Sequence, residues 1–126
     1  MQATKDELGV RNMRVLSAST LTGDNVVNRQ NEDLGTIEEL MIDTENGRIA
    51  YAVLSFGGFL GMGDKLFAIP WNALTVDTGE RRFVLDVDRS KLELAPGFDK
   101  DAWPNMADRT WGAEVYKYYD AKPYWI

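Results

Sequence analysis

Short segments with β-strand patterning follow one another between residues 26 and 88, and this rhythm constrains the fold more than any other sequence feature. Turn residues separate the segments, and no helix-length stretch stands between successive strands. The spacing excludes the βαβ units of parallel α/β folds and predicts a small antiparallel barrel, closed or half-closed. Six strands are expected, the first beginning at Val26 and the others covering 34–43, 48–56, 65–69, 75–77 and 82–88.

The strand expected at 48–56 is apolar on both of its faces. Ile49, Tyr51 and Val53 alternate along one face, and smaller and larger apolar side chains occupy the other. Antiparallel strands with one solvated face show a polar alternation, which is missing here. The pattern therefore predicts a central strand that is covered on both sides.

The preceding segment, 34–43, forms a hairpin with this central strand. Its alternation slips where Glu38 and Glu39 stand side by side, and the slip predicts a β-bulge. Asn46 and Gly47 supply the Asn-Gly pair that is the strongest short-range hairpin signal.

A glycine-rich segment follows the central strand and approaches the phosphate-binding motif G-x-x-x-x-G-K-[ST]. Asp64 precedes the lysine, no hydroxyl residue follows it, and a strand rather than a helix comes next. We interpret the segment as a tight barrel connection whose large apolar side chains pack in a core or contact a partner. The structural positions of this region are Gly57, Gly58, Gly61, Gly63 and Pro70, and its apolar side chains are Phe59, Leu60 and Met62.

The C-terminal third is rich in aromatic residues, with eight of the 14 in the chain after residue 96. Asp108 is the expected N-cap of a helix that runs to Tyr119 and carries an apolar stripe. Two interpretations remain open, because the stripe can pack on the barrel or dock on a second chain. The candidate interaction surface comprises Phe59, Leu60, Met62, Trp71, Trp111, Tyr118, Tyr119 and Trp125.

Composition excludes several classes of chemistry. The chain has no cysteine and no histidine, so it lacks the usual serine and cysteine triads and most zinc and iron sites. The acid pairs Glu38–Glu39 and Asp86–Asp88 lie on strands without a cleft, and no calcium loop is complete. We expect no enzyme activity, no cofactor and no metal.

Charge and hydropathy limit the partners. The net charge of −6 disfavours direct nucleic-acid binding and suits a basic protein. The longest apolar run is far too short to insert into a membrane. The N-terminus carries no apolar secretory segment, so a cytoplasmic protein is expected.

Four motifs occur in order between residues 34 and 71: Leu-Gly-x-Ile-x-x-Leu, Asp-x-x-x-Gly-Arg-Ile-x-Tyr-x-Val, Gly-Gly-Phe-Leu-Gly-Met-Gly and Phe-Ala-Ile-Pro-Trp. Together they resemble a PRC-barrel domain over residues 20–90. Tyr118-Tyr119 and Tyr124-Trp125 resemble the tails of small stand-alone bacterial members. The resemblance implies a six-stranded, mostly antiparallel barrel. Members occur in the cytoplasmic part of the photosynthetic reaction centre H subunit and in a ribosome maturation factor, where their roles rest on protein contacts.

The chain is therefore expected to comprise a flexible segment at 1–14, a PRC-type barrel at 15–90 and a helical, aromatic extension at 91–126. The first functional hypothesis is a non-catalytic interaction module that forms a homodimer or binds another protein. The second is a small-ligand binder or weak enzyme with a pocket between barrel and tail. The third is an accessory role in a membrane or ribosomal assembly, by family analogy.

Overall fold

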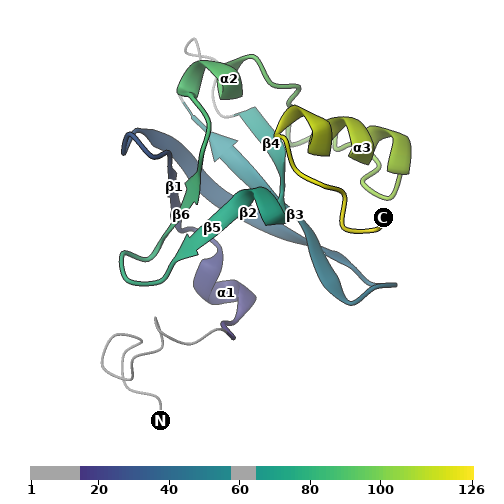
Figure 1. The fold of residues 1–126 in the computed structure, drawn as a ribbon, viewed down its shortest axis with the longest axis horizontal. Helices are drawn as coiled ribbons and strands as arrows, with labels where there is room; N and C mark the ends of the chain where they lie inside the picture. Colours follow the sequence, from purple (N-terminus) through teal and green to yellow (C-terminus); the bar gives the residue numbers. More distant parts are fainter. Residues whose placement is uncertain (1–14, 58–64) are drawn as a thin grey trace.

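The computed structural model describes residues 15–57 and 65–126. Six strands form one curled sheet in the order β4-β3-β2-β1-β6-β5, so the mainly β fold is confirmed (Figure 1). The elements are α1 (Ala18–Leu21), β1 (Asn25–Val27), β2 (Asp33–Asp43), β3 (Arg48–Phe56), β4 (Lys65–Pro70), η3 (Trp71–Ala73), β5 (Leu74–Asp77), β6 (Arg82–Leu85), α2 (Arg89–Glu93) and α3 (Arg109–Tyr118).

One strand pair departs from the antiparallel expectation. β1 runs parallel to β6, with Val26 opposite Phe83, whereas every other pair in the sheet is antiparallel. The cause lies between β4 and β5, where the chain passes through Pro70 and the η3 turn instead of a hairpin. The alternation of strand direction is interrupted there. β4 and β5 form the two ends of the sheet, which is a half-closed, mixed barrel.

The central position of β3 is confirmed. It lies between β2 and β4, and its residues 50–56 are all buried. The bulge predicted in β2 is present as a register shift between Ile37 and Glu39. The hairpin turn at Asn46 and Gly47 is also present, and Gly47 adopts a φ of +65°.

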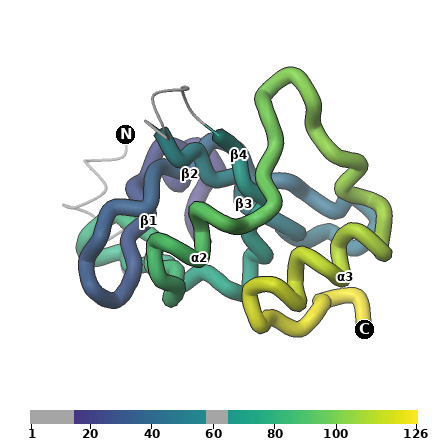
Figure 2. Tube along the Cα trace, turned by 90° about the horizontal axis from the view of Figure 1, so that it is seen from above, coloured from purple at the N-terminus to yellow at the C-terminus, as the bar shows by residue number. Residues whose placement is uncertain are grey.

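The C-terminal third covers the sheet from the side of β4. Asp108 caps α3 by accepting a hydrogen bond of 2.9 Å from the backbone amide of Thr110, as predicted. Val115 and Tyr116 of α3 are buried, and the segment after the helix returns beside it (Figure 2). The segment between α2 and α3 is pinned to β4 by paired backbone bonds between Leu66 and Phe98.

Several expectations fall outside the described residues. These are the lead-in at 1–14 and the loop positions Gly58, Phe59, Leu60, Gly61, Met62 and Gly63. Within 15–57 and 65–126, none of the helices has the length and apolar character needed to cross a bilayer.

Candidate functional site

Five aromatic side chains join the C-terminal extension to the sheet and form the aromatic cluster: Tyr51, Trp111, Tyr116, Tyr124 and Trp125. Ring centroids of Tyr51 lie 5.3 Å from Trp111 and 5.5 Å from Tyr116. Tyr116 in turn lies 5.2 Å from Trp125. Tilted and edge-on contacts at these separations are favourable beyond the area they bury. The aromatic tail therefore packs on its own chain.

Two features hold α3 close to the sheet. The buried hydroxyl of Tyr116 donates a hydrogen bond of 2.7 Å to the carbonyl of Ala50 on β3. Gly112 faces the same interface, and a Cβ there would lie 2.6 Å from the hydroxyl oxygen of Tyr51 and 3.0 Å from the ring of Trp125. A glycine is therefore needed for the helix to approach this closely.

A polar contact between Asp43, Arg109 and Tyr124, termed the latch, fastens the end of the tail to the β2–β3 hairpin. The Tyr124 hydroxyl donates to the Asp43 carboxylate. The Arg109 guanidinium lies 3.4 Å from the same carboxylate oxygen and 3.2 Å from the Tyr124 hydroxyl. Arg109 also stacks 4.5 Å from the ring centre of Trp125. Hydrogen bonds from Tyr124 and Asn46 hold the pKa of Asp43 well below its usual range.

The latch predicts an acid-sensitive tail. Because the pKa of Asp43 is lower in the folded chain than its ordinary value of 3.8, its stabilising effect is complete above that value. The effect is lost as pH falls through the lower folded pKa. We expect urea unfolding to show stability falling below about pH 4, and falling less steeply in Asp43→Asn. Asp101→Asn, at an exposed carboxylate, is the control; an unchanged pH slope in Asp43→Asn would contradict the role of the latch.

A groove of about 400 Å³ lies beside the latch and is termed the hairpin groove. It runs between the β2–β3 hairpin, the segment before α3 and the tail. Ile42 on its rim is 53% exposed, although it is a large aliphatic residue in a paired strand. Its lining is Met41, Ile42, Asp43, Thr44, Glu45, Ala50, Tyr51, Met106, Ala107, Arg109 and Tyr124.

A second, larger groove of about 660 Å³ lies between β6, η3 and the tail, and is termed the tail groove. It is open to solvent. A pocket was expected between barrel and tail, and the cavity at this position is a surface groove. Asp88 lies on one side at the N-cap of α2, without a side-chain capping bond. Its lining is Asn72, Ala73, Leu85, Asp86, Val87, Asp88, Lys91, Tyr119, Asp120, Ala121 and Lys122.

The structure divides the predicted interaction surface. Trp111 and Trp125 belong to the aromatic cluster, and Trp71 is half-buried against Phe83 with ring centres 5.9 Å apart. The Tyr118 hydroxyl donates a bond of 2.6 Å to the carbonyl of Lys91. Tyr119 is buried and lines the tail groove, whereas Phe59, Leu60 and Met62 are not described.

Sequence reasoning misses the residues that shape the two grooves. Ile42 and Met106 lie 64 positions apart, and nothing in the sequence brings them together. In the sequence, Asp43 indicates only a hairpin turn, and Tyr124 only an aromatic tail. The available signal is the cluster of aromatic residues at the C-terminus, which predicts a packing surface but not its polar partner on the hairpin.

The family model described as PRC-barrel domain matches residues 13–92, which is more than half of the chain. The chain belongs to the PRC-barrel family. The match covers the whole six-stranded sheet and ends in α2, whereas α3 and the tail follow it. No curated protein matches this PRC-barrel chain.

Among solved structures, a putative 16S ribosomal RNA processing protein RimM from Pseudomonas aeruginosa is similar, with 18% sequence identity and a TM-score of 0.41. The similarity covers 62% of the PRC-barrel chain and 47% of that structure. The match therefore spans about half of the length of that protein.

Proposed function

We propose that this PRC-barrel chain is a non-catalytic protein-interaction module that receives an apolar side chain of a partner in the hairpin groove. The exposure of Ile42 on the rim of a groove that Met41 and Met106 also line is the observation that carries the proposal. Apolar side chains that are exposed together around a concavity commonly mark a protein contact. The neighbouring Met41 and Met106 support this, because flexible thioether side chains adapt to a partner's surface.

The two ends of the hairpin groove differ in polarity, and this difference would orient a bound partner. Asp43 and Tyr124 are held by the latch, so this wall is already ordered before a partner binds. A preformed wall lowers the entropy that is lost on association. The apolar end at Ile42 would accept the anchor, and the polar end would meet the partner's backbone or polar groups. The net charge of −6 favours a basic partner.

Self-association is the first form of the interaction to test. A two-fold homodimer is the commonest symmetric assembly, and it would place two hairpin grooves in equivalent positions. A role as accessory factor of a membrane or ribosomal assembly is the narrower proposal raised by the family resemblance. The homodimer and the accessory role both require the exposed apolar rim at Ile42, so one substitution there tests both proposals.

We expect Ile42→Asp to weaken association by at least about 30-fold, because a charge would replace the apolar rim residue against which the partner's anchor packs. Leu94→Asp is the matched control, since Leu94 is 82% exposed and lies outside the groove. Light scattering measures the mass of both variants and of the native chain, and urea unfolding checks that each still folds.

A photo-crosslinking side chain at position 42 extends the test to other proteins. The proposal expects one specific crosslinked species at position 42, absent when the probe stands at position 94. A native chain that stays monomeric, together with equal crosslinking from both positions, would refute the proposed function.

A further inference from the structure

We propose that Asn46 is a site of spontaneous deamidation, and that the carboxylate formed there releases the latch. Asn46 is the only asparagine in the chain that glycine follows, and both residues are exposed in the turn between β2 and β3. Glycine carries no side chain to obstruct its backbone nitrogen, so an Asn-Gly pair in reach of water is prone to this reaction. The proposal rests on the geometry of the turn and does not require the function proposed above.

The reaction consumes water and needs no enzyme. The backbone nitrogen of Gly47 gives up its proton and attacks the side-chain carbonyl carbon of Asn46. The side-chain nitrogen takes up a proton and leaves as ammonia, and a five-membered succinimide remains. Water then opens this ring at either of its two carbonyl carbons, which gives aspartate or isoaspartate. Both products add a negative charge to the turn, and neither returns to asparagine.

One residue, Asp43, holds both reacting groups while the turn is closed. The side-chain amide of Asn46 donates a hydrogen bond of 2.9 Å to the Asp43 carboxylate. The backbone amide of Gly47 donates a bond of 2.8 Å to the Asp43 carbonyl. Both bonds must break before the nitrogen can attack, so the reaction proceeds from chains in which the turn has opened locally. The closed turn therefore slows deamidation.

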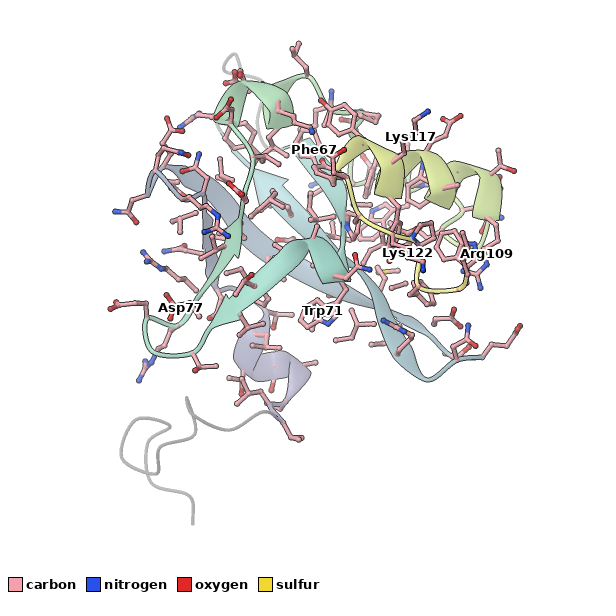
Figure 3. The ribbon with its side chains drawn as sticks, viewed as in Figure 1. Phe67, Trp71, Asp77, Arg109, Lys117 and Lys122 are labelled. Atoms are coloured by element: carbon pink, nitrogen blue, oxygen red, sulfur yellow. The ribbon has the colours of Figure 1, made fainter. Side chains whose placement is uncertain are left out.

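A single carboxylate oxygen connects this turn to the latch. Asp43 Oδ2 accepts hydrogen bonds from the Asn46 side chain, from the Tyr124 hydroxyl and from Arg109. Figure 3 shows Arg109 at the first turn of α3, where the helix lies beside the β2–β3 hairpin. Deamidation removes the Asn46 donor and puts a like charge beside Asp43. Loss of that bond also raises the pKa of Asp43 toward its ordinary value.

The consequence extends from the turn to the tail. With Asp43 repelled by its new neighbour, Tyr124 and Arg109 lose the acceptor that fastens the tail to the hairpin. Isoaspartate has a further effect, because it lengthens the backbone by one atom next to the pair formed by Asp43 and Arg48. Since hydrolysis of the succinimide is irreversible, the chain would change once from a latched to an unlatched form as it ages.

Peptide mapping by mass spectrometry tests the modification itself. The full chain is incubated at mildly alkaline pH, and the same chain unfolded in urea is the reference. We expect Asn46 to be converted in the folded chain, more slowly than in urea, and the exposed Asn105, which methionine follows, to stay intact. Asp43→Ala should speed the conversion in the folded chain about fivefold or more, the factor that corresponds to loss of one hydrogen bond. It should have no effect in urea, and Asp101→Asn is the matched control.

Two substitutions test the release of the latch. Asn46→Asp reproduces the aspartate product, whereas Asn46→Ala removes the same donor without adding a charge. We expect Asn46→Asp to lower the melting temperature at neutral pH by a few degrees more than Asn46→Ala does. The difference should shrink at high salt and vanish in an Asp43→Asn background. Tyr124→Phe should destabilise the Asn46→Asp chain less than the native chain, because the latch is already open.

Three outcomes would overturn the proposal. The first is an amide that persists at position 46 in the folded chain throughout an incubation in which the unfolded chain converts completely. The second is equal stability of Asn46→Asp and Asn46→Ala. The third is a Tyr124→Phe substitution that destabilises the native and Asn46→Asp chains equally. The function proposed for the hairpin groove is tested separately by Ile42→Asp, so its failure and the failure of this proposal are distinguishable.

Discussion

Gly35→Ala is expected to lower the free energy of unfolding by about 3–5 kcal/mol, a large loss for the addition of a single methyl group. Gly35 adopts a φ of +121°, which side chains of L-residues rarely tolerate. A Cβ at this position would lie 2.1 Å from the backbone carbonyl oxygen of Ser55 on the neighbouring strand. Because backbone atoms cannot rotate away, β2 and β3 would have to separate at this point.

Gly47→Ala is the matched control for this prediction. Gly47 also has a positive φ, of +65°, but no atom lies within 4 Å of the Cβ that alanine would add. We therefore expect a cost of only about 1 kcal/mol from backbone strain. Urea unfolding followed by circular dichroism measures both variants. Equal losses in the two variants would contradict the close contact between Gly35 and Ser55.

Tyr116→Ala is expected to cost about 3–5 kcal/mol, because it removes a fully buried ring from the centre of the aromatic cluster. Tyr116 is 1% exposed, and its ring contacts Tyr51, Tyr124 and Trp125. Without it, α3 and the tail lose their main apolar attachment to β3. The tryptophan fluorescence of the folded chain should shift to longer wavelength as Trp125 becomes solvated.

Two further variants separate the contributions of Tyr116. Tyr116→Phe keeps the ring but leaves the buried carbonyl of Ala50 without its donor, at a cost of about 1–3 kcal/mol. Glu114→Ala lies on the exposed side of α3 and controls for helix propensity. The interpretation fails if Tyr116→Ala is no more destabilising than Glu114→Ala.

The sheet could be predicted in large part because its signals are local. The slip at Glu38–Glu39, the Asn46-Gly47 pair and the double apolar face of β3 each lie within a few residues, and the structure bears each of them out. The parallel pairing of β1 with β6 had no such signal. β1 is only three residues long. Its pairing with β6 depends on the path that the chain takes after the η3 turn.

The grooves could not be predicted, because they depend on contacts between distant segments. The latch joins Asp43 to Tyr124, 81 positions apart, and the hydroxyl of Tyr119 is buried without a hydrogen-bond partner among the described residues. The cap at Asp108 and the apolar stripe of α3 were visible in the sequence. The stripe did not show whether it would pack on its own chain or on a partner, because apolar spacing is the same in both cases.

The parallel pair also determines when this fold can form during synthesis. Val26 can pair with Phe83 only after the ribosome has added 57 more residues to the chain. At translation rates of about 5–20 residues per second, that interval lasts roughly 3–11 seconds. Throughout it, β1 can pair with β2, but its other edge has no intramolecular partner. An unpaired strand edge is the kind of surface on which nascent chains aggregate. The shortness of β1 is therefore consistent with protection of the unfinished chain, quite apart from its place in the finished barrel.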